Sequence, residues 1–258
     1  MKIGLCTIAF SELPLEEVLN IASENGFDGV EIWGKEGHLP LNSEYEYVRE
    51  IKAMADAEGL EIAAFGSYIR PLSDDFEEQA ERALRITQGL GSGLMRVWSG
   101  GGPSKNISAS DKRLITMRLK TLCNWAQLYK ITIAVEMHGN NLTDNADSIL
   151  ELIEDVAYPG LKTYYQSLFH AESGDFYEAA QKIGKYIVNV HAQNAKRLKG
   201  GKIESCGIAD GMVDYKKIVE ILRQFDYDGY LEVEFVHGKD KLAALKKDRD
   251  FLAEIINL

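Results

Sequence analysis

One unit recurs along the chain, a short apolar run followed by a loop and an amphipathic helical segment, and it restricts the fold more than any other feature. Strands that alternate with helices predict a parallel sheet covered by helices. Eight such runs within 258 residues predict a (β/α)8 TIM barrel as a single domain over residues 1–258, because these barrels take about 250 residues. An open doubly wound sheet would have fewer strands and a phosphate motif after the first strand, where this chain reads SELPLEE. The expected strands are 3–10, 29–33, 61–66, 94–99, 131–141, 161–166, 186–191 and 230–236.

The fifth run, ITIAVEMHGNN at residues 131–141, indicates how the strands face. Ile133 and Val135 alternate with Glu136 and His138, so one face carries large apolar side chains and the other carries ionisable ones. Catalytic groups of TIM barrels lie at the C-terminal strand ends. We therefore expect Glu136 and His138 at the barrel mouth. The alternative is a strand-end Glu that only makes structural hydrogen bonds, beside a loop His.

The same alternation places polar side chains on the inward face of most strands. This inward set comprises Glu31, Trp33, Arg96, Trp98, Glu136, His138, Gln166, Asn189, His191, Gln193, Glu232 and Glu234. Ionisable groups that point into a barrel cost several kcal/mol unless they are paired or bind a metal. For Glu31, Arg96 and Glu232 we expect a salt-bridge layer in which the arginine pairs both carboxylates. On the last strand, Phe235 is expected to face the helices.

The other inward groups, Glu136, Gln166, His191 and Glu234, are expected to form a metal site. Two carboxylates and one imidazole suit a divalent cation such as Mn2+, Mg2+ or Co2+. Zinc is not excluded, although no cysteine ligand selects it.

Composition disfavours several classes of protein. The chain has 29 Lys and Arg against 40 Asp and Glu, and its net charge of -11 disfavours binding to nucleic acid or to anionic membranes. Cys6, Cys123 and Cys206 lie far apart without CxxC spacing, so buried or incidental thiols are expected. Since the chain also lacks an apolar segment of about 18 residues, we expect a cytoplasmic protein with a small-molecule substrate. A homo-oligomer is one of the assemblies left open.

Several segments resemble strand-end motifs of a known family. GFDGVEIWG, LMRVWSGG, AVEMHGNNLTD, VNVHAQN and DYDGYLEVEF are similar to those of the sugar phosphate isomerase/epimerases, in the xylose isomerase-like TIM-barrel superfamily. The resemblance implies metal ligands Glu, Asp, His and Glu on the last four strands, which correspond here to Glu136, Gln166, His191 and Glu234. Gln166 is a departure, and His170 follows it after four residues where the family has a His after three. Arg197 matches a substrate-binding arginine of the epimerases.

The resemblance also implies an activity, that of a metal-dependent isomerase or 3-epimerase of a small ketose, its phosphate or a related polyol. Glu136 and Glu234 would remove and return a proton on opposite faces of an enediolate. Substrate contacts would come from His138, His170, Arg197, Trp33 and Trp98.

Three alternatives to an isomerase stay open. An inosose-type dehydratase would lose water from the same enediolate. A sugar-binding barrel with a decayed metal site is indicated by Gln166. A DNA-repair endonuclease of the superfamily would need more histidines than the 5 present and a basic cleft. The basic run of Lys196, Arg197, Lys199 and Lys202 is expected to be a solvated loop, with phosphate binding as the weaker alternative.

Overall fold

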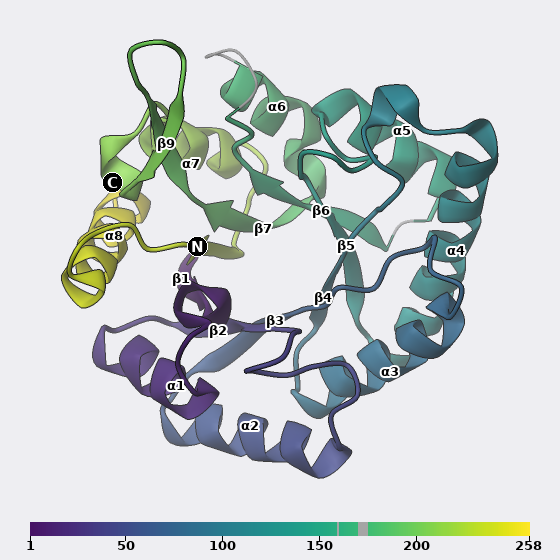
Figure 1. Ribbon diagram of the computed structural model, residues 1–258, viewed down its shortest axis with the longest axis horizontal. Coiled ribbons are helices and arrows are strands. Elements are labelled where there is room, and N and C mark those ends of the chain that lie inside the picture. The colour runs from purple at the N-terminus through teal and green to yellow at the C-terminus, as the bar shows by residue number, and fades with distance from the viewer. Residues whose placement is uncertain (159, 170–174) are drawn as a thin grey trace.

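The computed structural model describes residues 1–158, 160–169 and 175–258. Within them, eight parallel strands close into a barrel in the order β1-β10-β7-β6-β5-β4-β3-β2 and are ringed by helices (Figure 1). The barrel strands are β1 (Lys2–Cys6), β2 (Gly29–Trp33), β3 (Glu61–Gly66), β4 (Leu94–Val97), β5 (Thr132–Glu136), β6 (Leu161–Gln166), β7 (Ile187–Ala192) and β10 (Tyr230–Val233). The predicted (β/α)8 barrel is confirmed.

Eight α-helices in the same residue ranges cover the outside of the strands. They are α1 (Leu15–Glu24), α2 (Tyr45–Ala57), α3 (Phe76–Gly89), α4 (Ala109–Tyr129), α5 (Ala146–Val156), α6 (Asp175–Ile183), α7 (Tyr215–Arg223) and α8 (Lys241–Ile256). One face of α1 is apolar and buried, because the large side chains recur at helical spacing. The buried residues are Leu15, Val18, Leu19 and Ala22. None of the helices described is long and apolar enough to span a bilayer.

Two apolar layers confirm the alternation predicted for the strands. Ile133 and Val135 belong to the large cluster that joins strands to helices. Ala64, Ala134 and Tyr164 form a separate, fully buried cluster. Because successive side chains of a strand point to opposite faces, the second cluster is the inside of the barrel. Glu136 continues the inner face of β5 beyond Ala134, so it reaches the C-terminal end of the barrel.

The first strand is shorter than the predicted 3–10 range. β1 ends at Cys6, and Thr7–Phe10 form a 3-10 helix. The Thr7 hydroxyl oxygen accepts a hydrogen bond from the backbone N–H of Trp33 at 2.9 Å and lies 2.9 Å from Nδ1 of His38. The side chain of Thr7 in this tight turn therefore links the end of β1 to the end of β2 by a hydrogen bond.

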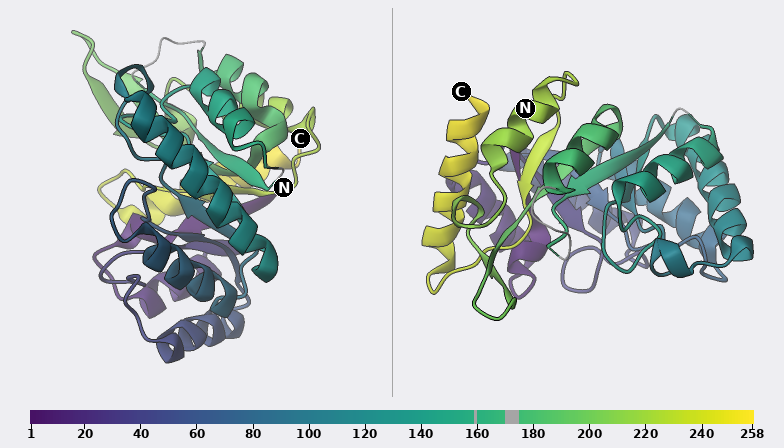
Figure 2. Two further views of the ribbon diagram at one scale, coloured as in Figure 1. Left: turned by 90° about the vertical axis from the view of Figure 1, so that its right-hand side faces the viewer. Right: turned by 90° about the horizontal axis from the view of Figure 1, so that it is seen from above.

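A second correction concerns the predicted basic loop after β7. β8 (Asn194–Arg197) and β9 (Ile203–Cys206) pair as an antiparallel hairpin, which projects away from the barrel (Figure 2). Asn194 anchors its base, because its Nδ2 donates to the carbonyl oxygens of Ile208 and Val213 at 2.7 and 2.8 Å. The hairpin leaves Lys196 and Arg197 exposed.

The start of α5 lies just after the end of β5. Asn145 is its N-cap, and the Asn145 side chain accepts a hydrogen bond from the backbone N–H of Ser148. Thr143 donates from its hydroxyl to the carbonyl oxygen of Glu136 at 2.5 Å. This bond fixes the backbone at the end of β5, where Glu136 enters the site.

Candidate active site

A cavity of about 290 Å³ lies at the C-terminal ends of the barrel strands. Ten of the twelve residues predicted to face inward line it, the exceptions being Asn189 and Glu232, which lie deeper. The ten are Glu31, Trp33, Arg96, Trp98, Glu136, His138, Gln166, His191, Gln193 and Glu234. Strand parity alone therefore located most of this cavity's wall.

Glu136, His191 and Glu234 form what we call the mouth cluster. Nδ1 of His191 lies 3.2 Å from Oε1 of Glu136 and 3.5 Å from Oε1 of Glu234. The three side chains are buried, and one ligand atom of each lies within 4.8 Å of the others. Oε2 of Glu234 is buried and has no hydrogen-bond partner in the described part of the chain. Carboxylate and imidazole donors at this spacing could hold a divalent cation.

The other nitrogen of the same imidazole faces a second group, Cys6, Glu31, His191 and Glu232, which we call the inner cluster. Nε2 of His191 lies 3.3 Å from Oε2 of Glu31 and 3.8 Å from Oε2 of Glu232. Cys6 Sγ lies 3.6 Å from that Glu232 oxygen. The ring of Tyr164 stands edge-on to His191, with centroids 5.0 Å apart, and limits the rotation of the imidazole. Residue spacing could not indicate Cys6 as a member of this cluster, because its neighbours come from other strands.

Arg96 pairs with two carboxylates, but they are not the predicted pair. Its Nη1 lies 2.7 Å from Oε2 of Glu136 and its Nε lies 3.3 Å from Oε1 of Glu31. Glu232 is held instead by Asn189, whose Nδ2 donates to its Oε2 at 2.7 Å. Glu232, on β10, lies one inward position deeper in the barrel than Glu234, and no ion pair joins it to Arg96.

Gly66 on β3 makes room for the ion pair of Glu31 and Arg96. A Cβ at Gly66 would collide with Oε1 of Glu31 and lie 3.0 Å from Nη2 of Arg96. We expect Gly66→Ala to lower the free energy of unfolding by about 1–3 kcal/mol, the usual cost of overpacking. Gly93→Ala is the matched control, because a Cβ there meets nothing within 4 Å. Urea denaturation of both variants measures the difference, and equal midpoints would contradict the proposed fit.

The carboxyl groups of the site differ in acidity. Burial would raise the pKa of Glu136, but Arg96 and His191 outweigh it and bring that pKa to about 2. Burial raises the pKa of Glu234 to about 7, against the opposing effect of His191. Burial and the charge of Glu31 raise the pKa of Glu232 to about 8. Near neutral pH, Glu136 is therefore ionised while Glu234 exchanges its proton.

Gln166 ends β6 directly opposite His191 in the strand register. Its side chain is 2% exposed, and its Oε1 accepts a hydrogen bond from Nε2 of Gln193 at 2.9 Å. The amide oxygen thus stands beside the mouth cluster while already holding one hydrogen bond. Its metal ligation stays a prediction.

Aromatic rings form one wall of the cavity, as predicted for Trp33 and Trp98. Trp33 donates from Nε1 to the hydroxyl of Tyr68 at 2.8 Å, and Tyr68 stacks on Trp98 at 5.8 Å. His138 also lies against Trp98, with ring centroids 4.5 Å apart. Nε1 of Trp98 is buried without an acceptor among the described residues, so a ligand hydroxyl could accept its hydrogen. Tyr68 was missed because it follows β3 in a loop, where parity gives no direction.

The predictions for Phe235, Arg197 and His170 have three different outcomes. Phe235 lines the cavity and is 36% exposed, because β10 ends at Val233 and parity with the strand is lost. Arg197 is exposed on the β8–β9 hairpin and is not among the residues that line the cavity. His170 lies outside the described residues. The substrate-binding roles of Arg197 and His170 stay predictions.

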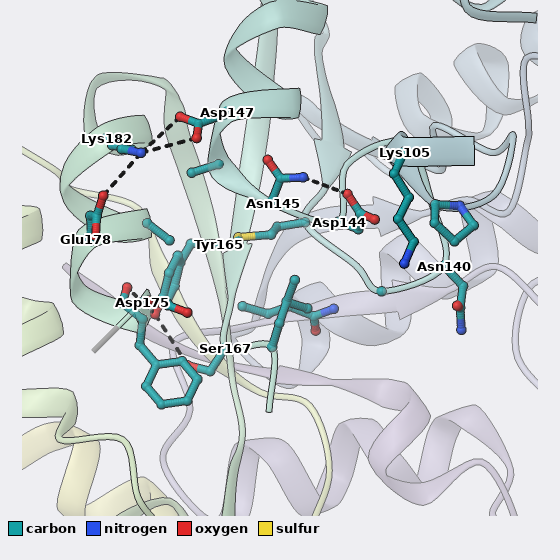
Figure 3. Close-up of a pocket in the computed structure, with 18 residues that line it drawn as sticks. Lys105, Asn140, Asp144, Asn145, Asp147, Tyr165, Ser167, Asp175, Glu178 and Lys182 are labelled. Carbon is teal, nitrogen blue, oxygen red and sulfur yellow. Dashed lines mark hydrogen bonds and ion pairs between the residues drawn. The ribbon is translucent and has the colours of Figure 1, made fainter. Parts of the chain in front are cut away.

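A larger cavity of about 620 Å³ opens beside the first, between the ends of β5 and β6 and the helices that follow them (Figure 3). Its Lys182 is paired with Asp147 at 3.0 Å and with Glu178 at 3.1 Å. Gln166 lines both cavities. Because the mouth cluster faces only the smaller cavity, we place the chemistry there.

The closed (β/α)8 barrel makes this chain a TIM-barrel protein, and the cluster of carboxylates and one imidazole at its mouth is a candidate metal site. The family model described as xylose isomerase-like TIM barrel matches residues 19–255, and the chain belongs to this family. This confirms the predicted superfamily.

Relatives in this family carry different activities by name. The chain is 28% identical to the 3-dehydroshikimate dehydratase of Bacillus anthracis, over 96% of each chain. It is 20% identical to the fructoselysine 3-epimerase of Escherichia coli O157:H7, over 92% of this chain and 90% of the relative. Both are enzymes, one a lyase and the other an epimerase.

Solved structures of the same fold contain metal ions. A xylose isomerase-like TIM barrel protein from Mycobacterium smegmatis in complex with magnesium has a TM-score of 0.81 at 16% identity, covering 99% of this chain and 96% of that one. The IOLI protein with a zinc atom has a TM-score of 0.81 at 15% identity, covering 100% and 98%. At this identity, the likeness shows the fold alone.

Proposed function

We propose that this protein is a divalent-metal-dependent enzyme that removes a proton beside a carbonyl group of a small polyhydroxylated ketone and then eliminates water. The mouth cluster carries the proposal, because it sets two carboxylates of different acidity around one imidazole at the wall of a cavity. The relative of 28% identity, a dehydratase by name, supports elimination as the outcome. 3-Dehydroshikimate is accordingly the first substrate to test.

The mouth cluster fits a divalent cation by its donors and by one unsatisfied atom. Glu136, His191 and Glu234 would hold the ion, and Oε2 of Glu234 would gain the partner that it otherwise lacks. When bound, such an ion polarises a carbonyl group and acidifies the adjacent C–H bond. The magnesium and zinc complexes of the same fold are compatible with this choice.

Proton transfer is assigned to Glu234. In the metal-free site the pKa of Glu234 is about 7 and that of Glu136 is about 2, so Glu234 takes up a proton more readily than Glu136 does. Arg96 holds Glu136 in its charged form through the 2.7 Å ion pair. Glu136 would thus hold charge, while Glu234 accepts the proton from carbon.

His138 is placed to donate a proton to the departing hydroxyl group. Its Nδ1 lies 2.6 Å from the carbonyl oxygen of Gly139 and can donate a hydrogen to it. A His138 imidazolium would keep this hydrogen and give its Nε2 proton to the leaving oxygen, ending as the neutral imidazole. The ring lines the cavity next to Trp98. Together, Glu234 takes one proton from carbon and His138 supplies one to oxygen, so a water molecule leaves.

Measuring the mass of the product tests the proposed activity. Protein supplied with Mn2+ should convert 3-dehydroshikimate into a product that is lighter by one water, while a panel of ketoses and inososes defines the breadth. Mass spectrometry with and without chelator gives the answer. No change in mass or in chirality for any of these substrates would contradict the proposed enzyme and favour a sugar-binding barrel.

A metal-dependent isomerase or 3-epimerase is the second candidate. Glu136 and Glu234 lie 3.2 and 3.5 Å from Nδ1 of His191, so two carboxylates at the cavity wall could exchange protons with one substrate. The 3-epimerase of 20% identity supports this outcome. A product of unchanged mass and altered chirality would select it over the dehydratase.

Gln166 gives a prediction for metal affinity. A carboxamide oxygen is neutral, so Gln166→Asp should add a charged ligand and tighten Mn2+ binding by about tenfold. Gln193→Glu is the control, because it places a charge on the neighbouring amide without altering position 166. Calorimetric titration compares the variants. Equal dissociation constants for the wild type and Gln166→Asp would remove Gln166 from the metal's ligands.

A further inference from the structure

Three members of the inner cluster, Cys6, Glu31 and Glu232, have no role in the proposed reaction. Its four side chains come from β1, β2, β7 and β10, and all are buried. We propose that Cys6, Glu31, Glu232 and His191 form a second cation site, which selects a thiophilic divalent ion such as Zn2+ or Cd2+. This site is separate from the one on which the proposed function rests, although both use His191.

Three of the distances between its donor atoms are close to those around a tetrahedral ion, and all of them are within 4.8 Å. Zinc bonds of about 2.0 Å to oxygen and nitrogen and about 2.3 Å to sulfur place neighbouring ligand atoms about 3.3 to 3.5 Å apart. Nε2 of His191 lies 3.3 Å from Oε2 of Glu31, and Cys6 Sγ lies 3.6 Å from Oε2 of Glu232. The widest of these separations, 3.8 Å between Nε2 of His191 and Oε2 of Glu232, needs only a small closure.

One buried oxygen of this cluster has no partner. Oε1 of Glu232 makes no hydrogen bond to any described residue, although the side chain is 0% exposed. Gly4 on β1 makes room for this side chain, because a Cβ there would lie 2.7 Å from Cγ and 3.0 Å from Oε1 of Glu232. A fully buried carboxyl oxygen without a donor is costly, and a cation bound by both carboxyl oxygens of Glu232 would satisfy it.

Groups around the cluster orient its ligands. Asn189 donates to Oε2 of Glu232 at 2.7 Å, and Arg96 binds Oε1 of Glu31 while leaving Oε2 directed at His191. Such outer partners are usual around metal ligands. Cys6, Glu31 and His191 also line the cavity, so an ion can enter from the mouth.

The thiol decides which ion the site selects. Thiolate sulfur favours Zn2+ and Cd2+, whereas carboxylate and imidazole without sulfur suit Mn2+ and Mg2+. A neutral imidazole has one lone pair. An ion on Nε2 of His191 therefore leaves the hydrogen on Nδ1 and removes the only nitrogen ligand of the mouth cluster. Thiophilic ions at the inner cluster should compete with Mn2+ at the mouth.

Cobalt absorption tests the inner site directly. Co2+ bound to wild-type protein should show the near-ultraviolet charge-transfer band of a cobalt thiolate. Cys6→Ser should lose the band, and Cys123→Ser, which alters a buried thiol on α4 outside the cluster, should keep it. Cadmium affinity should fall more than about 100-fold in Cys6→Ser, because even residues that only orient ligands are worth about 10- to 100-fold. A wild-type spectrum without the band would overturn the proposal whatever the variants do.

A competition experiment separates the two sites. Cd2+ should weaken Mn2+ binding in the wild type and in Cys123→Ser but not in Cys6→Ser, each compared with its own Mn2+ affinity measured without Cd2+. Glu234→Gln should lose Mn2+ binding while it retains the cobalt thiolate band. A missing cobalt thiolate band with normal Mn2+ binding refutes the inner site alone. A normal cobalt thiolate band without Mn2+ binding refutes the mouth site alone.

Discussion

Glu234→Gln should lower turnover by about two to four orders of magnitude, the usual contribution of a positioned general base. The substitution keeps the shape of the side chain and removes the group whose pKa of about 7 suits proton exchange near neutral pH. Stability without metal should change little, because the amide resembles the protonated carboxyl that burial favours. Activity and thermal melting should therefore separate in this variant.

Two comparisons sharpen that expectation. Glu220→Gln alters an exposed carboxylate on α7 and should leave turnover unchanged. Glu136→Gln should also lose activity, but it breaks the 2.7 Å pair with Arg96 and should lower the melting temperature as well. Steady-state kinetics on the three variants gives the result. Retention of more than about a tenth of wild-type turnover by Glu234→Gln would exclude it as the base.

The largest expected effect on stability belongs to Arg96. This arginine is 3% exposed and is paired with Glu31 and Glu136, so Arg96→Met would leave two buried carboxylates without their cation. Removing one partner of a buried ion pair costs about 3–5 kcal/mol. For a chain of this length, the melting temperature should fall by about 6–20 °C, since each kcal/mol corresponds to about 2–4 °C.

Arg85→Met is the matched control, since Arg85 pairs with Glu81 on the surface of α3 and its side chain is 64% exposed. Surface pairs of this kind are worth about 0.3–0.5 kcal/mol. Differential scanning calorimetry of both variants should show a large loss only for Arg96→Met. Similar losses would mean that Arg96 contributes as little as a surface pair.

Strand periodicity was enough to predict the barrel and most of the cavity wall. The alternation in β5 assigned Val135 to the helix side and Glu136 to the inside, and both assignments hold. Glu234 and His191 were found by the same rule, because an ionisable side chain on an inward face has few physical explanations. Where the strands end, the rule stops, which is why Phe235 was placed on the wrong side.

The sequence alone could not predict which inward side chains pair with one another. Arg96 pairs with Glu136 instead of Glu232 because the depth of each residue depends on the stagger between strands, and strand parity does not specify stagger. Cys6 escaped notice for a related reason. Its neighbours Glu31 and Glu232 come from other strands, and only the closed barrel brings them together.

Titrating Mn2+ into metal-free protein tests most directly whether Glu136, His191 and Glu234 bind a divalent cation. We expect one ion per chain and a stabilisation of about 2.7 kcal/mol at a free Mn2+ concentration of 100 times the dissociation constant. Affinity should rise between about pH 6 and about pH 8 as Glu234, whose pKa is about 7, loses its proton. It should continue to rise above that range, because, against the effect of burial, the neighbouring carboxylates raise the pKa of His191 and its imidazole must also lose a proton to become a ligand. Glu234→Gln should abolish the stabilisation. A wild-type melting curve that is the same with Mn2+ and with chelator would contradict the metal site and the function built on it.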